Sequence, residues 1–281
     1  MTNAVLLLSP AARDLVYGEP VMASLCARAN LLGTIAPADA WPRHRELLRE
    51  AEVIFSGWGA PRMDDAFLAA LPRLQAIFYA GGSVRYFVTD ALWSRGIRLT
   101  TAQAINAVPV SEYAASVIQL GLKRFWHFAR LTRETRTFPA ERPMPGAYRS
   151  KVGLISYGII ARQVRSRLRA LAVEVIVSDP FLTADEARAE AVRQVGLDEL
   201  FATADVVSLH TPHLRETVGL VTGRHFERMK PGALFLNTAR GEVVREPEMV
   251  AVLGRRPDLQ AVLDVTAPEP PPPDSPLYSL P

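Results

Sequence analysis

A short turn and the acidic residue that follows it are the features of this sequence that most directly suggest chemistry. Ser156, Gly158 and Ala161 follow the apolar run 152–155 with the spacing S-x-G-x-x-A. This is the position of the G-x-G-x-x-G fingerprint, whose middle glycine lets the backbone approach a pyrophosphate. The turn predicts a dinucleotide site, in which the cofactor contacts Tyr157, Gly158, Ile159 and Ile160.

Ser156 departs from the fingerprint, because it replaces the glycine of the tight turn. A residue other than glycine is strained where φ is positive. Ser156 therefore either has an ordinary φ or donates a hydrogen bond from its hydroxyl group. Gly158 and Ala161 still provide what pyrophosphate approach and close helix–strand packing require.

Asp179 follows the next apolar run, 174–178, and lies 21 positions beyond Gly158. A carboxylate at this place hydrogen-bonds the hydroxyls of the adenine ribose and repels a 2′-phosphate. Residues 180–182 contain no arginine that would receive such a phosphate. The sequence therefore favours NAD over NADP as the cofactor, with a helix or turn cap as the alternative role of Asp179.

Short apolar runs alternate with segments of helical period along the chain. Several runs are apolar throughout, which is typical of parallel strands covered by helices on both faces. We predict strands at residues 5–8, 52–56, 76–79, 97–100, 152–155, 174–178, 206–209, 233–237 and 260–263. Predicted helices include residues 64–71, 110–128, 159–172, 222–229 and 246–253. The alternation indicates an α/β fold with doubly wound parallel sheets.

Two sheets are predicted, because the polar, proline-bearing segment 133–149 separates two sets of strands and helices. A long helix is expected to start after Pro109 and to connect the two sets. Proline suits the first turn of a helix, and Glu112 would lie near the positive end of its dipole. The proline-dense residues 268–276 predict a stiff extended crossover.

The composition is that of an ordinary globular protein and limits the kinds of partner. With 32 basic and 29 acidic side chains the net charge is +3, which is too small to indicate a nucleic-acid partner. The arginines at 162, 165, 167 and 169 are expected to form a solvated face, with a phosphate patch as the alternative. Cys26 is the only cysteine and is expected to be a buried structural thiol. No signal peptide, membrane span or metal site is expected, so we predict a cytoplasmic protein.

Four longer blocks resemble one enzyme family. They are A-D-V-V-S-L-H-T-P at 204–212, M-K-P-G-A-L-F-L-N-T-A-R-G at 229–241, D-V-T-A-P-E-P at 264–270 and A-G-G-S-V at 80–84. From about Leu74 to Pro281 the sequence is similar to the D-isomer-specific 2-hydroxyacid dehydrogenases. The resemblance implies a substrate domain with a flavodoxin-like sheet over residues 1–103 and a Rossmann NAD domain over residues 104–267. Residues 268–281 would begin a return segment to the first domain.

The resemblance also implies roles for single residues. Arg240 matches the arginine that binds the 2-oxo acid and polarises its carbonyl, for which a planar guanidinium is suited. Glu269 matches the acid that orients a catalytic histidine and raises its pKa. The implied cofactor contacts are His210, Thr211, Pro212, Thr238, Ala239 and Asp264. The backbone amides of Gly82, Ser83 and Val84 would hold the substrate carboxylate, and Asn106 and Ser111 fall in the hinge and cofactor-side segment.

The largest departure from the family concerns the proton donor. In the family the histidine that Glu269 would orient follows a segment like residues 277–281, and the five histidines of this sequence match no such position. The sequence is expected either to be a truncated form of a longer protein or to be a short homologue without the acid–base group. Near the substrate loop, Arg85 would be a solvated charge or add positive charge beside an acidic substrate. Trp58 and Arg62 could also face the substrate.

These residues predict an NAD-dependent oxidoreductase that interconverts a 2-oxo acid and a D-2-hydroxy acid. The family implies a homodimer built largely on the NAD domain. Turnover by these 281 residues is expected to be poor, because the histidine is missing. The alternative is an NAD(H)-binding or sensing homologue without catalytic activity, because a fold does not fix a function.

Overall fold

The computed structural model describes residues 1–139 and 145–280, and the chain forms two compact units, Met1–Asn106 and Ala107–Pro281. The division falls three residues after the predicted boundary at 103 and lies inside helix α6 (Gln103–Leu122). Residues 140–144 of the predicted 133–149 linker, and Pro281, lie outside the described residues.

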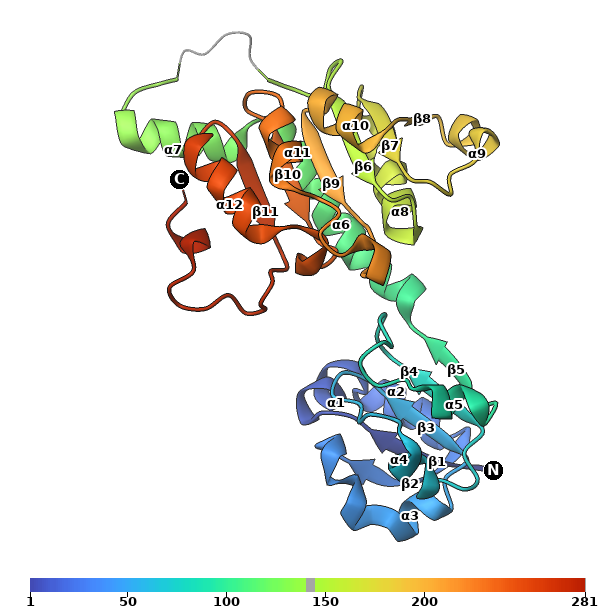
Figure 1. Ribbon diagram of the computed structural model, residues 1–281. Helices are drawn as coiled ribbons and strands as arrows, with labels where there is room; N and C mark the ends of the chain where they lie inside the picture. The colour runs from blue at the N-terminus through green and yellow to red at the C-terminus, as the bar shows by residue number, and fades with distance from the viewer. Residues whose placement is uncertain (140–144, 281) are drawn as a thin grey trace. The chain divides into compact units, whose positions relative to one another are not determined.

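The first unit contains a parallel sheet of five strands in the order β2-β1-β3-β4-β5 (Figure 1). This is the flavodoxin-like order 2-1-3-4-5 that was predicted. The strands are β1 (Thr2–Leu7), β2 (Ala29–Ile35), β3 (Val53–Ser56), β4 (Ala76–Tyr79) and β5 (Arg98–Thr101). The helices are α1 (Pro10–Val16), α2 (Glu19–Cys26), α3 (Arg45–Arg49), α4 (Asp65–Ala69) and α5 (Asp90–Ser94), with the 3₁₀ turn η1 (Ala38–His44).

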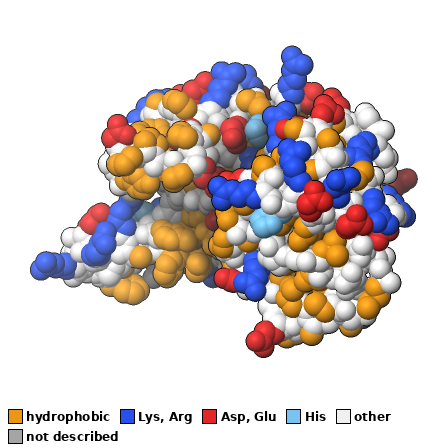
Figure 2. Space-filling model, turned by 90° about the horizontal axis from the view of Figure 1, so that it is seen from below, with side chains coloured by type: hydrophobic (Ala, Val, Ile, Leu, Met, Phe, Trp, Pro, Cys, Tyr) orange, Lys and Arg blue, Asp and Glu red, His pale blue; other side chains and the backbone are white. Residues whose placement is uncertain are grey.

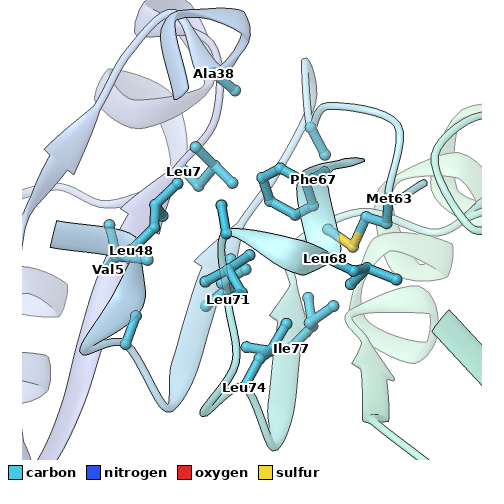
Figure 3. Close-up of a cluster of buried hydrophobic side chains, with 14 of the residues drawn as sticks. Val5, Leu7, Ala38, Leu48, Met63, Phe67, Leu68, Leu71, Leu74 and Ile77 are labelled. Carbon is cyan, nitrogen blue, oxygen red and sulfur yellow. The ribbon is translucent and has the colours of Figure 1, made fainter. Parts of the chain in front are cut away.

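Alternating strand residues of the first unit build its two apolar layers. Val5, Leu7 and Ile77 face a core that also contains Leu48 of α3 and Phe67 of α4. Figure 3 shows these side chains pointing toward one another from the strands and the helices. The opposite sheet face buries Leu6 and Leu8 against Ala12 of α1 and Tyr17. The period of two along the strands therefore places helices on both faces, as a doubly wound sheet requires.

The second unit contains a parallel sheet of six strands in the order β11-β10-β9-β6-β7-β8 (Figure 1). Read from β8, this is the Rossmann order 3-2-1-4-5-6, with the topological switch point between β6 and β9. Its strands are β6 (Lys151–Ile155), β7 (Glu174–Ser178), β8 (Arg193–Gln194), β9 (Val206–Leu209), β10 (Leu234–Asn237) and β11 (Gln260–Leu263). The α-helices after α6 are α7 (Phe125–Thr135), α8 (Ile159–Arg167), α9 (Ala184–Ala189), α10 (Leu197–Thr203), α11 (Gly223–Arg228) and α12 (Glu246–Arg255). Four 3₁₀ turns complete it: η2 (Leu168–Ala170), η3 (Arg215–Thr217), η4 (Gly241–Val243) and η5 (Pro276–Tyr278).

Helices cover both faces of this second sheet. One apolar layer joins α6 and α8 to Val152 and Leu154, and the other joins α10, α11 and α12 to Val207 and Phe235. A Cβ atom on Gly153 would lie 2.6 Å from the Leu200 side chain, so α10 can pack this closely only against glycine. Leu277 and Leu280 also pack against the second layer, which places this part of the expected return segment with the second unit.

Several local predictions from the sequence are wrong. The long helix starts at Gln103, so Pro109 lies inside α6 and not in its first turn. The sequence missed the strands β2 and β8. Cys26 is exposed at the end of α2, a helix with no buried residue, and is not a buried thiol.

The arginines of α8 and η2 lie beside acidic side chains. Arg162 contacts Glu186 at 2.9 Å, and Arg169 contacts Glu190 at 3.2 Å. On the face drawn in Figure 2, blue Lys and Arg side chains are interspersed with red Asp and Glu side chains. The ion pairs of Arg162 and Arg169 support the solvated-face interpretation of the arginine cluster.

Within residues 1–139 and 145–280, no helix is both long and apolar enough to span a bilayer. In the same part of the chain, no group of three or more His, Cys, Asp or Glu side chains is placed to hold a metal ion.

Candidate functional site

The turn between β6 and α8 has the conformation of a dinucleotide-binding loop. Ser156 has φ of 66°, the left-handed conformation that the first glycine of the fingerprint normally supplies. Its Oγ atom lies 2.9 Å from the Thr211 hydroxyl oxygen at the end of β9. Ser156 therefore does not have an ordinary φ. Its hydroxyl group is hydrogen-bonded to Thr211 at a neighbouring strand end, in agreement with the second alternative.

Gly158 leaves an open approach to the N-terminus of α8. It is the N-cap residue of this helix, with φ of −78° and ψ of −166°. A Cβ atom built on Gly158 would meet no atom within 4 Å. Ala161, on the inner face of this helix, is fully buried, and Ile159 at the first helical position is 39% exposed. The loop therefore has the open face and the buried packing residue that a bound pyrophosphate needs.

Tyr157 does not offer its side chain to a ligand. The residue is 3% exposed, and its ring packs in the apolar layer shared with α6 and α8. Burial raises the pKa of the Tyr157 hydroxyl to about 12. The hydroxyl oxygen has no hydrogen-bond partner in the described residues. Of the predicted contacts at Tyr157, only the backbone remains a candidate.

Replacing Tyr157 by phenylalanine is expected to leave the free energy of unfolding unchanged or to raise it by up to about 1 kcal/mol. A buried hydroxyl without a partner loses its hydration on folding and gains no hydrogen bond. Tyr17→Phe is the matched control, because its buried hydroxyl donates to the Ser56 carbonyl oxygen at 2.9 Å. Urea denaturation should show that only Tyr17→Phe is destabilised, by about 1 kcal/mol. A comparable loss in Tyr157→Phe would contradict the assignment.

Asp179 lies at the carboxyl end of β7, beside the glycine loop. Its Oδ2 atom accepts a hydrogen bond from the Tyr157 backbone amide at 2.6 Å, and Oδ1 accepts one from the Phe181 amide at 2.7 Å. These bonds fix the carboxylate at the end of the strand next to β6. A carboxylate oxygen has a second lone pair, so the capping role and a ribose contact are compatible.

The end of β9 carries His210, Thr211 and Pro212. Thr211 is 2% exposed, and Pro212 is exposed. His210 is half-buried, with its Nε2 atom 3.0 Å from Ser208 Oγ. The Nδ1 atom of His210 is buried and has no partner in the described residues.

His210 should make the stability of the protein depend on pH below neutrality. Burial lowers its pKa from 6.5 to about 4. Between these values the unfolded chain binds more protons, so the stabilisation is complete above pH 6.5 and is lost as the pH falls toward 4. Between pH 7 and pH 4.5, the wild type should lose roughly 2 kcal/mol more of its free energy of unfolding than His210→Gln.

Urea unfolding at the two pH values measures this difference. His44→Gln, at an exposed position at the end of η1, is the control and should keep the pH dependence of the wild type. Equal losses in the wild type and His210→Gln would show that His210 titrates normally.

The loop after β10 is shaped by Asn237, a residue that sequence reasoning did not single out. Asn237 is 1% exposed, and its Oδ1 atom accepts a hydrogen bond from the Ala239 amide at 2.9 Å. Its Nδ2 group donates to the Arg240 carbonyl oxygen at 3.1 Å. Asparagine side chains commonly bind the backbone two residues on, so an Asn at the last position of the strand was the available signal.

Arg240 and Thr238 therefore lie in a defined turn at the carboxyl end of β10. Arg240 is exposed, so its guanidinium is accessible to a ligand. Thr238 is 7% exposed, and its Oγ1 atom is buried without a partner in the described residues. Ala239 packs partly against the core of the second unit.

A second loop, after β11, lies directly against this turn. A Cβ atom on Gly241 would come within 2.1 Å of the Thr266 carbonyl carbon and 2.6 Å of the Ala267 amide nitrogen. The Ala267 amide donates to the Glu246 carboxylate at 3.0 Å, which anchors the loop to the start of α12. Asp264 and Glu269 are exposed on the same loop. His210 hydrogen-bonds Ser208 and His225 hydrogen-bonds Thr222, and neither of them bonds Glu269.

The predicted substrate loop follows β4 in the first unit. Within the described residues, the backbone amides of Gly82, Ser83 and Val84 donate no hydrogen bond to the protein. The preceding Gly81 must be glycine, because its Cβ atom would lie 2.6 Å from the Tyr79 ring. Three consecutive amides without protein acceptors are suited to binding an anion.

Other predicted residues have varied surroundings. Ser111 is fully buried in α6 and donates to Gln163 Oε1 at 2.9 Å, a structural contact with α8. Trp58 is 47% exposed on the loop after β3. Tyr86, also half-exposed, lies close to that loop, with its hydroxyl 3.4 Å from the Gly57 carbonyl oxygen. Asn106 is half-buried, at the last position of the first unit.

A dinucleotide fits the second unit on grounds of its own structure. The glycine loop and Asp179 lie on one side of the switch point, and His210 and Thr238 follow neighbouring strands on the other, since Leu209 pairs with Asn237. In the part of the chain that the structure describes, His210 Nδ1 and Thr238 Oγ1 are buried polar atoms without hydrogen-bond partners. Buried polar atoms are rarely left unpaired, so their presence at this sheet edge indicates a polar ligand.

Residues 117–281 match the family model described as D-isomer-specific 2-hydroxyacid dehydrogenase, NAD-binding domain. The chain belongs to this family. The second unit is thus an NAD-binding domain, as predicted. A (S)-sulfolactate dehydrogenase of Chromohalobacter salexigens is 34% identical over 211 residues, which cover 74% of this chain and 68% of that protein.

A D-3-phosphoglycerate dehydrogenase of Archaeoglobus fulgidus is 31% identical over 220 residues, or 78% of this chain. The match spans only 42% of that relative's length. Among solved structures, the TT0316 protein of Thermus thermophilus has a TM-score of 0.72 at 26% identity, covering 99% of this chain and 86% of that one. A phosphoglycerate oxidoreductase from Rhizobium etli has a TM-score of 0.79 at 21% identity, covering 100% and 85%, a likeness of fold.

Proposed function

We propose that the chain binds NAD(H) and interconverts a 2-oxo acid and a D-2-hydroxy acid by hydride transfer. The observation that carries this proposal is the turn after β10, where Asn237 binds the backbone on both sides of an accessible Arg240. An arginine presented at the carboxyl end of a strand, in a family of NAD-binding dehydrogenases, is suited to binding an acidic substrate. A cytoplasmic location and a homodimer remain predictions.

In the proposed reaction NADH supplies the hydride that reduces the carbonyl carbon. Arg240 binds the 2-oxo acid and draws electron density toward the carbonyl oxygen, which favours attack at the carbon. Within the first unit, the free amides of Gly82, Ser83 and Val84 are proposed to bind a carboxylate. Asn237 and Gly241 act on Arg240 only through the shape of its loop.

Reduction of the carbonyl group also requires a proton donor for its oxygen atom. This requirement predicts slow turnover by these residues. Glu269 is exposed, and His210 and His225 hydrogen-bond Ser208 and Thr222 in place of Glu269. Since proton transfer by a positioned side chain contributes about 10²–10⁴-fold to rates, its absence would leave binding intact and catalysis weak. The second candidate function is therefore an NAD(H)-binding homologue without significant turnover.

Two measurements separate these functions. Titration with NADH and NADPH, followed by cofactor fluorescence, should show tighter binding of NADH, because Asp179 repels the 2′-phosphate. NADH oxidation is then measured with glyoxylate, hydroxypyruvate and larger 2-oxo acids in the wild type and in Arg240→Gln. Slow oxidation that Arg240→Gln abolishes supports the dehydrogenase. NADH binding with no oxidation of any acid supports the binding protein, and tighter NADPH binding would refute the cofactor assignment.

A further inference from the structure

Two half-exposed aromatic side chains lie on neighbouring loops of the first unit. Trp58, in the loop after β3, is 47% exposed, and Tyr86, in the loop after β4, is 50% exposed. Isolated exposed apolar side chains are ordinary, whereas several gathered on one surface often mark a binding site. Neither residue takes part in the proposed steps of hydride transfer.

The two loops leave the same edge of the sheet. β3 and β4 are parallel neighbours, and their last residues, Ser56 and Tyr79, pair with each other. The Ala80 amide also donates a hydrogen bond to the Ser56 carbonyl oxygen at 2.9 Å. Both loops therefore start at the carboxyl edge of the strands, which is where open α/β sheets bind ligands.

Trp58 lies at the topological switch point of this sheet. In the order β2-β1-β3-β4-β5 the direction of the chain reverses between β1 and β3. The amide of Ser9, in the loop after β1, donates to the Trp58 carbonyl oxygen at 2.9 Å. A Cβ atom on Gly59 would lie 2.8 Å from the Ser9 side chain, so the two loops meet closely. The backbone that carries the indole ring is therefore held from both sides of the switch point.

Tyr86 connects the Trp58 loop to the free amides of residues 82–84. Its hydroxyl oxygen lies 3.4 Å from the Gly57 carbonyl oxygen and 3.1 Å from the hydroxyl oxygen of Tyr79. The Tyr79 ring in turn lies directly beside Gly81, where a Cβ atom would come within 2.6 Å of it. Through these contacts the exposed rings lie next to the loop whose amides are suited to an anion.

Arg62 does not give these loops a second anion-binding site. It lines one hollow together with three carboxylates, those of Asp64, Asp65 and Asp90. Because three negative charges outweigh one guanidinium, this hollow is unsuited to a phosphate or a second carboxylate. Arg85 is exposed and is the other cation of the loops after β3 and β4, so a variant of Arg85 forms part of the test.

We propose that, in the first unit, the carboxylate bound by the amides of residues 82–84 belongs to an aromatic 2-oxo acid, whose ring lies on Trp58 and Tyr86. This inference rests on the proposed function and names the class of its substrate. Aromatic rings attract one another in offset or edge-to-face contacts, and such contacts remove apolar surface from water. Trp58 and Tyr86 are specificity-determining residues in this scheme, because they contact the ring and not the reacting carbonyl group.

Ligand-observed NMR titration of the full chain tests the proposal, with saturating NAD⁺, which carries no hydride to transfer. Phenylpyruvate should bind about 30-fold more tightly than pyruvate, the gain expected from covering roughly 80 Å² of apolar ring surface. The methyl ester of phenylpyruvate lacks the charge held by the amides and should bind at least about 10-fold more weakly than the acid. 2-Oxoglutarate, which has a second carboxylate and no ring, should bind no more tightly than pyruvate.

Trp58→Ala should reduce the preference for phenylpyruvate over pyruvate from about 30-fold to about 5-fold, because one of the two rings is lost. Trp58→Phe keeps a ring and should restore most of this preference. Trp93→Ala is the matched control, because Trp93 is 52% exposed in the same unit but belongs to helix α5. It should keep the preference of the wild type.

Equal affinities of the wild type for phenylpyruvate and pyruvate would overturn the aromatic class, even if Trp58→Ala does not fold, and would leave the proposed function intact. Tighter binding of 2-oxoglutarate than of phenylpyruvate, lost in Arg85→Gln, would overturn it in favour of an acidic substrate. Failure of the wild type to bind any 2-oxo acid would instead refute the proposed function together with its substrate class.

Discussion

Gly241→Ala is expected to destabilise the second unit by about 3 kcal/mol or more, or to prevent its folding. The added Cβ atom would lie 2.1 Å from the carbonyl carbon of Thr266 and 2.2 Å from its oxygen. Both atoms belong to the backbone, so no rotation of a side chain relieves the clash. Overpacking usually costs about 1–3 kcal/mol, and a clash that must displace two loops belongs at or above the top of that range.

The same substitution should also disturb the site. Gly241 directly follows Arg240, and the Thr266 loop that it contacts carries Asp264 and Glu269. If the protein folds by separating these loops, NADH affinity should fall together with stability. Urea denaturation and NADH fluorescence titration of the same sample measure both effects.

Gly254→Ala is the matched control for this prediction. Gly254 lies in α12, and its Cβ atom would meet nothing within 4 Å. Alanine is a better helix former than glycine by up to about 1 kcal/mol, so this variant should be as stable as the wild type or more so. A free energy of unfolding for Gly241→Ala within about 1 kcal/mol of the wild type would mean that the two loops do not pack as described.

Gly158→Val is expected to weaken NADH binding at least about 100-fold while leaving the fold intact. The valine side chain would enter open space, because no protein atom lies within 4 Å of the Cβ position. The φ of −78° is also allowed for valine. The same space is where a pyrophosphate must approach the backbone, so the side chain would exclude the cofactor and not the protein.

Gly196→Val separates this effect from the loss of a helix cap. Gly196 is the N-cap residue of α10, and its Cβ position is equally open. Both variants should lose about 1 kcal/mol or less of stability, since valine is a poorer N-cap residue than glycine. Only Gly158→Val should lose NADH affinity. Dissociation constants within threefold of each other would show that the pyrophosphate does not lie at Gly158.

The fold was largely predictable, because buried parallel strands produce continuous apolar runs. β4, β7, β9 and β11 have the predicted bounds. β2 was missed because its sequence, A-N-L-L-G-T-I, is interrupted by Asn30, Gly33 and Thr34 and is not a continuous apolar run. β8 has two residues, too few for any periodic pattern. Proline normally marks a helix start, but Pro109 is an exposed residue inside α6, whose neighbouring residues Ala107 and Ser111 are buried.

The positions of the candidate residues were predictable at the ends of strands and helices, and were not where a side chain shapes a loop. Asp179 and Gly158 occupy the expected positions at the strand and helix ends. Asn237 hydrogen-bonds the backbone of Ala239 and Arg240, a contact that the sequence motifs did not single out. Tyr157 shows the opposite case, because its place in the motif did not indicate that its ring turns into the core.

The single cysteine allows a fluorescent dye to be attached at one defined position. Because Cys26 is the only thiol in the chain and lies exposed at the end of α2, a maleimide dye would attach to one site without prior mutagenesis. The dye would lie in the first unit, whereas fluorescent NADH would bind in the second. Energy transfer between the two would then report, in real time, whether the units move when a 2-oxo acid is added.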